Sequence, residues 1–330
     1  MIIHTRSYPR AGLVGNPSDG YYGKTIAFLF KNFAAEVVLW ESPELEILPN
    51  SRDGSKFDSI HHLAEDVSTF GYYGGIRLLK ATIKRFYEYC QENNVTIQER
   101  NFTLRYCSNI PHHVGLAGSS AIVTAALRAL CEFYGVVIPK PITPNLILSV
   151  EKDELHISAG LQDRVIQTYE GMAYMDFDRE VMARQGYGLY ESLDTALLPP
   201  LYIAYDARMA EGSEVFHNDI RERFNRGEAE VVEAMHFWAD LTEQAKAALI
   251  AGDRDKLHDL MNANFDRRLR IYKISQRNIA MIQAARACGA SAKFTGSGGA
   301  IVGAYRDEEM YYRLRQAFEP MGICLFKPVL

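Results

Sequence analysis

A loop of small residues that leads into a helix carries the plainest chemistry in this sequence. Residues 115–120 read Gly-Leu-Ala-Gly-Ser-Ser, and an alanine-rich pattern with helical spacing runs from 122 to 134. We expect the two serines at the helix N-cap and in its first turn. A helix N-terminus presents unbonded N–H groups and the positive end of the helix dipole, so the loop predicts an anion site, most often for phosphate. A serine-capped core helix entered through a glycine turn has the same pattern.

Two further loops combine glycine with polar residues. Residues 15–19 read Gly-Asn-Pro-Ser-Asp after an apolar strand pattern, and alone they could be a solvated turn. Residues 293–299 read Lys-Phe-Thr-Gly-Ser-Gly-Gly within a strand–glycine–strand pattern. Neither loop is a common nucleotide motif. Ser18 stands where a P-loop would need glycine, and Ile301 stands where a dinucleotide fingerprint needs its third glycine.

Taken in order, the three loops resemble the three motifs of the GHMP sugar kinases, which include galactokinase, homoserine kinase and mevalonate kinase. The first motif matches 10–19, the phosphate loop matches 111–121, and the third motif matches 293–299. Within this family, four runs are similar to the glucuronokinase branch. They are Gly15-Asn16-Pro17-Ser18-Asp19, Gly71-Tyr72-Tyr73-Gly74-Gly75, Gly160-Leu161-Gln162-Asp163-Arg164 and Lys293-Phe294-Thr295-Gly296-Ser297-Gly298-Gly299.

The resemblance implies an ATP-dependent kinase that phosphorylates D-glucuronate at its anomeric hydroxyl to give D-glucuronate 1-phosphate. Phosphoryl transfer from ATP needs backbone donors around the phosphates, a metal that neutralises charge, and an oriented acceptor hydroxyl. The loop residues implied to hold ATP are Gly115, Leu116, Ala117, Gly118, Ser119, Ser120, Gly296, Ser297 and Gly298.

The remaining roles also follow from the resemblance. Ser120 and Glu151 match the hydroxyl and carboxylate that bind Mg²⁺, an ion that takes hard oxygen ligands and keeps several waters. Asp163 matches the aspartate that faces the acceptor hydroxyl, as a general base or as an orienting group. Arg10 matches a cation that would keep Asp163 ionised.

Each of these carboxylates also has a structural interpretation. Glu151 belongs to a charged run that ends at Glu154, so it could be a solvated charge on a helix surface. Asp163 could do no more than form an ion pair with Arg10 or Arg164.

The acceptor side departs from the family pattern. Gly15-Asn16-Pro17 replaces the usual Gly-Glu-His, which argues against a galactose-like or mevalonate-like acceptor, and the phosphate loop is one residue longer than the common form. We expect Asn16, Asp19 and Arg164 to bind the sugar. A uronate carboxylate also needs a cation, for which a planar guanidinium is best suited. The candidates are Arg10, Arg77, Lys80, Arg164 and Arg221.

Two alternatives to a glucuronate kinase stay open. One is another sugar kinase of the family, acting on a heptose, fucose or galacturonate. The other is a non-catalytic nucleotide or sugar sensor on the same fold. The presence of Ser120, Glu151 and Asp163 together argues against the sensor, because a protein that only binds does not need all three.

The elements that must position these residues predict an α+β chain with two lobes. Strand patterns dominate the first 50 residues, and helical patterns dominate from 213 to 288. A proline-containing shift in composition at 195–201 suggests a boundary. With this boundary, the resemblance implies the two-lobed GHMP kinase fold, with an N-terminal ATP-binding lobe at 1–195 that is similar to domain 2 of ribosomal protein S5 and a ferredoxin-like C-terminal lobe at 196–330.

Composition narrows the classes of partner. The 330 residues carry a net charge of −5, which disfavours nucleic acid and anionic membranes. The five cysteines show no Cys-x-x-Cys spacing, which suggests reduced thiols, a cytoplasmic location and no zinc site. The first residues lack the apolar core of a signal peptide. We expect a sugar acid and ATP as small-molecule partners, and the oligomeric state is left open.

Overall fold

The computed structural model describes residues 1–49, 53, 59, 74–206 and 214–330. The chain divides into two compact units that alternate along the sequence. The first unit contains Met1–Pro9, Phe33–Ile110 and Ala117–Ala159. The second contains Arg10–Asn32, Pro111–Leu116 and Gly160–Leu330. Most of the predicted site residues, including Arg10 and Asp163, belong to the second unit.

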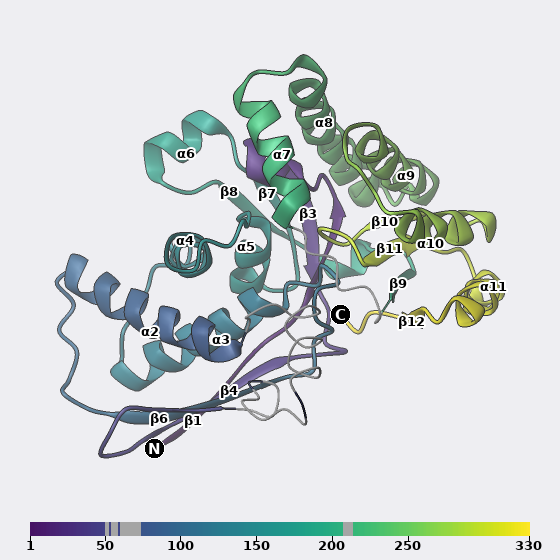
Figure 1. Ribbon diagram of the computed structural model, residues 1–330. Coiled ribbons are helices and arrows are strands. Elements are labelled where there is room, and N and C mark those ends of the chain that lie inside the picture. The colour runs from purple at the N-terminus through teal and green to yellow at the C-terminus, as the bar shows by residue number, and fades with distance from the viewer. Residues whose placement is uncertain (50–52, 54–58, 60–73, 207–213) are drawn as a thin grey trace. The chain divides into compact units, whose positions relative to one another are not determined.

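The first unit is a four-stranded sheet covered by helices. Its strand order is β1-β4-β6-β5, with β5 parallel to β6 and the other pairs antiparallel. The alanine-rich helix α3 is buried along most of its length and packs on β1 and β4, with α2 beside it (Figure 1). The strands are β1 (Ile2–Ser7), β4 (Ala35–Glu41), β5 (Glu46–Leu48) and β6 (Phe102–Ser108). The helices are α2 (Gly75–Glu92), α3 (Gly118–Tyr134), α4 (Thr143–Ser149) and the π-helical turn η2 (Val150–Glu154).

The second unit begins with an antiparallel sheet of order β2-β3-β7-β8. Every residue of β2 is buried, so this strand lies in the core and carries Arg10 at its first position. The strands are β2 (Arg10–Val14), β3 (Lys24–Leu29), β7 (Met172–Asp176) and β8 (Leu189–Leu193). The helical elements around them are η1 (Ser18–Tyr21), α5 (Gln162–Tyr169), α6 (Arg179–Gln185) and η3 (Thr195–Leu197).

A second antiparallel sheet completes this unit, with order β10-β11-β9-β12. The chain runs from β9 through helices to the β10–β11 pair and then through α11 to β12, which is the connectivity of a ferredoxin-like fold. The strands are β9 (Leu201–Tyr205), β10 (Lys293–Phe294), β11 (Ala300–Ala304) and β12 (Cys324–Phe326). The helices are α7 (Glu214–Asn225), α8 (Ala229–Ala251), α9 (Arg254–Ile271), α10 (Gln276–Ala287), α11 (Glu308–Phe318) and η4 (Glu319–Met321) (Figure 1).

Most elements expected from the sequence are present, and the α+β class is confirmed. The short helix α6 and the strands β8 and β9 were not anticipated. β8 is an edge strand whose residues are largely solvent-accessible, so it lacks the alternation that identifies a half-buried strand.

Residues 71–73 of the second glycine run lie outside the described residues. The expected lobe boundary at residue 195 falls within the second unit, and the two-lobe division stays a prediction.

Candidate active site

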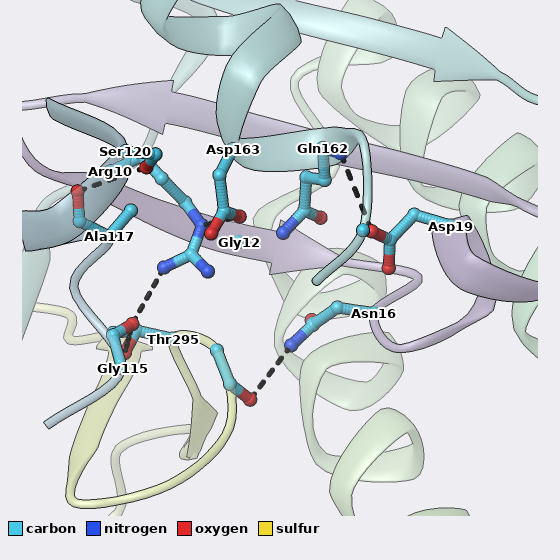
Figure 2. A network of polar contacts seen from close by, with 12 residues as sticks. Arg10, Gly12, Asn16, Asp19, Gly115, Ala117, Ser120, Gln162, Asp163 and Thr295 are labelled. Atoms are coloured by element: carbon cyan, nitrogen blue, oxygen red, sulfur yellow. Dashed lines mark hydrogen bonds and ion pairs between the residues drawn. The ribbon is translucent and has the colours of Figure 1, made fainter. Parts of the chain in front are cut away.

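An ion pair between Arg10 and Asp163 forms the centre of the candidate site. These residues are 153 positions apart in the sequence, and Arg10 Nε donates to Asp163 Oδ1 at 2.6 Å. Arg10 is 5% exposed, and its Nη1 donates to the Gly115 carbonyl oxygen at 2.6 Å (Figure 2). Arg164 lies on the other side of the carboxylate, with Nη1 3.3 Å from Asp163 Oδ2. The strand β2 and the first turn of α5 therefore bring two guanidinium groups to one carboxylate.

These partners determine the charge state of Asp163. Burial by itself would raise the pKa of this carboxyl, because it penalises the charged form. The charges of Arg10 and Arg164, with hydrogen bonds from Arg10 and Gln162, outweigh burial and hold the pKa of Asp163 below its ordinary value. Asp163 is therefore an ionised carboxylate at neutral pH, able to accept a hydrogen bond from a hydroxyl.

A second carboxylate, Asp19, lies in the same unit on the helical turn η1. Its Oδ2 accepts the backbone N–H of Gln162 at 3.4 Å (Figure 2). Burial and the negative charge of Asp163 raise the pKa of Asp19 to about 6. The carboxylate packs so closely on Gly160 that a Cβ there would collide with Oδ2, which explains the glycine before Gln162 and Asp163.

Gln162 links the two carboxylates and was not among the site residues predicted from the sequence. It is 2% exposed, its backbone N–H binds Asp19, and its side chain hydrogen-bonds Asp163. Its Oε1 is buried and has no hydrogen-bond partner in the part of the chain that the structure describes. Buried acceptors are normally satisfied, so this oxygen can accept a hydrogen bond from a bound ligand. The sequence signal was its position directly before Asp163.

The first and third glycine loops are held together in this unit by the buried lysine Lys293. Its Nζ donates at 2.6 Å to each of three oxygens, those of the Gly12 carbonyl, the Asn16 side chain and the Phe294 carbonyl. The Asn16 amide in turn donates to the Gly296 carbonyl at 3.4 Å (Figure 2). Burial, together with the charges of Arg268 and Arg10, lowers the pKa of Lys293. Asn16 is therefore fixed by contacts at both ends of its amide.

Helix α9 contributes two buried polar side chains to the same loops. Asn264 accepts the Gly15 N–H at 2.6 Å and donates to the Asn16 carbonyl at 3.1 Å. Arg268, one turn later, donates to the Gly296 carbonyl at 2.8 Å and the Ser297 carbonyl at 3.1 Å. Neither Asn264 nor Arg268 was predicted from the sequence. Their signal was a polar residue at two successive positions of an otherwise apolar helix stripe.

Close approach also explains glycine at position 296. A Cβ there would lie 2.6 Å from the Gly115 carbonyl oxygen and 2.8 Å from Arg10 Nη2. Thr295 Oγ1 donates to the same Gly115 carbonyl at 3.1 Å, and the Leu116 carbonyl accepts the Arg10 N–H at 3.3 Å. The second unit thus collects the residues of the first and third motifs, the start of the phosphate loop and the carboxylates around one polar network.

The rest of the phosphate loop belongs to the first unit and begins α3. The helix starts at Gly118, and its N-cap is Ala117 in the left-handed region, with φ 62°. The predicted serine N-cap is therefore wrong, because Ser119 and Ser120 both lie in the first turn. Ser120 Oγ donates to the Ala117 carbonyl at 3.2 Å (Figure 2). Backbone N–H groups at this end of the helix have no intrahelical acceptor, as an anion site requires.

Glu151 is fully buried in the first turn of η2, which excludes its interpretation as a solvated surface charge. Its Oε1 accepts the hydroxyl of Ser119 at 2.7 Å. The resemblance implies Ser120 and Glu151 as Mg²⁺ ligands, which stays a prediction, and Ser119 is a further hydroxyl at Glu151. A hydroxyl and a carboxylate this close are the hard oxygen donors that Mg²⁺ takes alongside phosphate oxygens and water. Across the described ranges, no three His, Cys, Asp or Glu side chains gather as a metal cluster.

Solved structures share this fold over nearly the whole chain. A Lin0012 protein from Listeria innocua has a TM-score of 0.77 at 14% identity, covering 99% of this chain and 97% of that one. Lactococcus lactis galactokinase in complex with galactose has a TM-score of 0.76 at 14% identity, covering 100% of this chain and 93% of that one. A phosphomevalonate kinase from Streptococcus pneumoniae gives 0.73 at 14% identity, with full coverage of both chains. At these identities the likeness shows that the chain has the same fold as these three structures.

Sequence comparison identifies the family. The model of the GHMP kinases N-terminal domain matches 77–171, and that of the GHMP kinases C-terminal domain matches 245–319. Glucuronokinase 1 from Arabidopsis thaliana is 45% identical over 306 residues, covering 91% of this chain and 84% of that protein. Probable glucuronokinase 2 from the same plant is also 45% identical, over 308 residues. The chain belongs to the GHMP kinase family, which confirms the resemblance seen in the motifs.

No described helix has both the length and the apolar character of a membrane span.

Proposed function

We propose that this protein is an ATP-dependent sugar kinase that phosphorylates the anomeric hydroxyl of D-glucuronate and releases D-glucuronate 1-phosphate and ADP. Identity of 45% to a glucuronokinase over 91% of the chain supports the activity. The observation that carries the chemistry is the Asp163 carboxylate, held ionised by Arg10 at 2.6 Å and by Arg164.

The anomeric hydroxyl of the sugar donates a hydrogen bond to Asp163. This hydrogen bond orients the hydroxyl oxygen toward the γ-phosphorus of ATP. The new P–O bond forms as the bond to ADP breaks, and the hydroxyl proton passes to Asp163. Because the pKa of Asp163 is lowered, the carboxylate is a weak base. It therefore takes the proton late, after the attacking oxygen has become acidic through bonding to phosphorus. Arg10 offsets negative charge on Asp163 and on the transferred group.

The nucleotide and metal roles are part of the same proposal. Backbone N–H groups of 115–120 and of the 296–298 loop bind the phosphates of ATP. Ser119 or Ser120 and Glu151 hold Mg²⁺, which, when bound, neutralises charge on the phosphates. Support comes from the buried Glu151 and from its 2.7 Å contact with Ser119. Asn16 and Asp19 read the sugar hydroxyls. A cytoplasmic location is proposed from cysteine usage.

The activity is tested by a screen of free sugars for ATP-dependent formation of sugar 1-phosphate, read by ADP release and phosphorus NMR. D-glucuronate, D-galacturonate, D-glucose, L-fucose and a heptose cover the alternatives. Glucuronate turnover with product at the anomeric position is expected. Turnover of a neutral sugar in preference to glucuronate, or ADP release with no acceptor preference, would reject the proposal.

The metal ligands are tested by varying Mg²⁺ with Ser119→Ala, Ser120→Ala and Glu151→Gln. Each ligand lost should raise the Mg²⁺ concentration for half-maximal activity, since the site has few protein oxygens. The contact between Ser119 and Glu151 predicts the larger shift for Ser119→Ala of the two serine variants. If none of the three variants changes the metal dependence, this ligand set is wrong.

A further inference from the structure

The proposed acceptor brings a third negative group to a site that already contains two carboxylates. Asp19 and Asp163 influence each other electrostatically, as the raised pKa of Asp19 indicates. A uronate carboxylate buried beside them needs a cation whose donors are available, because a buried charge without a partner is costly. This need rests on the proposed function, and the second unit contains several cations that could meet it.

Four cations of this unit are buried and already hold other groups. Arg10 and Arg164 form ion pairs with Asp163, and Arg10 also donates a hydrogen bond to the Gly115 carbonyl. Arg268 directs both of its amino groups at carbonyls of the third loop. Lys293 donates to three oxygens of the first and third loops. If one of these side chains turned to bind a substrate carboxylate, it would break a hydrogen bond or ion pair that holds the site together.

Arg221 differs from these four. It lies on α7, it is half-buried, and Nη1 donates to the Gly20 carbonyl oxygen at 2.6 Å. Among the residues that the structure describes, this carbonyl is its one recorded acceptor. Its guanidinium lies 4.2 Å from the ring centroid of Tyr21. Stacking and one anchoring hydrogen bond fix the plane of the group and leave Nε and Nη2 available.

The hydrogen bond to Gly20 also places Arg221 at η1, the turn that contains Asp19. Gly20 directly follows Asp19, and both belong to η1 together with Tyr21. The Tyr21 ring is held from another direction by the edge contact of Phe224, with centroids 4.9 Å apart. Burial raises the pKa of Tyr21, and Arg221 lowers it while Asp19 raises it, so both charges act on the same hydroxyl. The guanidinium is therefore anchored to the backbone of Gly20, the residue that follows Asp19.

We propose that Arg221 binds the carboxylate of the acceptor sugar and thereby sets the preference for a uronic acid over a neutral hexose. The available Nε and Nη2 form the edge of the guanidinium that pairs with both oxygens of a carboxylate. Asp19, one residue before the Gly20 anchor, reads a hydroxyl of the same sugar. Arg221 is thus the specificity residue, whereas Arg10 and Arg164 serve Asp163.

The test compares D-glucuronate with D-glucuronamide, which has the same shape and no charge. The wild-type protein should prefer glucuronate by a factor on the order of 10³ or more in kcat/KM, because the uncharged analogue leaves the guanidinium without its ionic partner. Arg221→Met should bring this ratio to within about tenfold, mostly through a higher KM for glucuronate. Arg221→Lys keeps the charge and loses the planar pair of donors, so an intermediate ratio is expected.

Arg226→Met is the matched control. It follows α7, its side chain is 65% exposed, and its recorded ion pair is a 4.0 Å contact with Glu222. The variant loses the same charge and should keep the wild-type ratio. If wild-type protein does not phosphorylate glucuronate, the proposed function fails. If it does and Arg221→Met keeps the wild-type ratio, the role of Arg221 is overturned. Should Arg221→Met not fold, Arg221→Lys decides: a ratio at least about tenfold below wild type supports the role, and an unchanged ratio overturns it.

Discussion

Asp163 and Asp19 lie in the same unit, and their surroundings shift their pKa values in opposite directions. Two guanidinium groups contact Asp163 and hold its pKa below the ordinary value. Asp19 has a single recorded hydrogen bond, from the Gln162 N–H, and burial beside Asp163 raises its pKa to about 6. The two side chains are of the same type, so the difference comes from their neighbours: Asp163 stays ionised, whereas Asp19 is costly to ionise.

The largest expected effect is the loss of the charged carboxylate. Asp163→Asn should cut kcat by roughly 10²–10⁴-fold and leave ATP binding nearly intact, because in the proposed mechanism this group faces the acceptor and not the nucleotide. Steady-state kinetics and calorimetric titration with ATP measure the two quantities. Near-normal turnover in this variant would show that the charge of Asp163 is not needed for the reaction, and the catalytic role of Asp163 would be rejected.

Removing the cation should make Asp163 more like Asp19. In Arg10→Gln, burial of Asp163 is countered only by Arg164 and Gln162, so its pKa rises. The acid limb of the pH profile of kcat/KM should move to higher pH, and the rate near neutrality should fall by roughly 10²-fold, typical of a lost electrostatic contact.

Arg10→Lys is the control, since it keeps a positive charge and should move the acid limb less. A profile identical to the wild type in Arg10→Gln would show that Arg10 does not set the charge state of Asp163.

Asp19 should lower stability at neutral pH. Its folded pKa of about 6 lies above the ordinary value of 3.8, so ionisation costs folding free energy as pH rises through this window. The cost approaches about 3 kcal/mol above pH 6 at about 1.4 kcal/mol per pKa unit. Asp19→Asn should therefore unfold at higher denaturant concentration than wild type at pH 8 and show no gain near pH 4.

Asp259→Asn is the control, because it removes one negative charge at an exposed position of α9. It should leave the denaturant midpoint nearly unchanged at both pH values. Equal stabilisation of Asp19→Asn at both pH values would mean that the effect does not come from ionisation.

The smallest effect is expected at the residue that joins the two carboxylates. Gln162→Met keeps the size of the side chain and removes its hydrogen bond to Asp163 and the unpaired Oε1. Loss of one hydrogen bond to a charged group should lower kcat/KM by about tenfold and raise the pKa of Asp163 slightly. A pH profile of Gln162→Met measures both, and an unchanged kcat/KM would exclude Gln162 from the site.

Much of the local structure could be read from the sequence. Apolar periodicity predicted α3 and most of the strands, though not β8 or β9, and the glycine runs marked the loops around Gly115 and Gly296. The family and its kinase fold followed from motif order. These features depend on near neighbours in the chain, through backbone propensity, turn geometry and the close approach that only glycine permits.

The tertiary structure decided which polar side chains are buried and what they contact. The charged run around Glu151 looked like a helix surface, yet that residue is fully buried while Lys152 and Asp153 are exposed. Its contact with Ser119 depends on where α3 begins, one turn earlier than its apolar pattern.

Long-range pairing was equally beyond the sequence. The ion pair of Arg10 with Asp163 spans 153 residues, and Lys293 reaches Asn16 across 277. Asn264 and Arg268 interrupt an apolar stripe of α9 because they face backbone groups of distant loops. Local patterns report how a segment folds, whereas the charge state of Asp19 and Asp163 depends on burial and on partners that only the packed chain supplies.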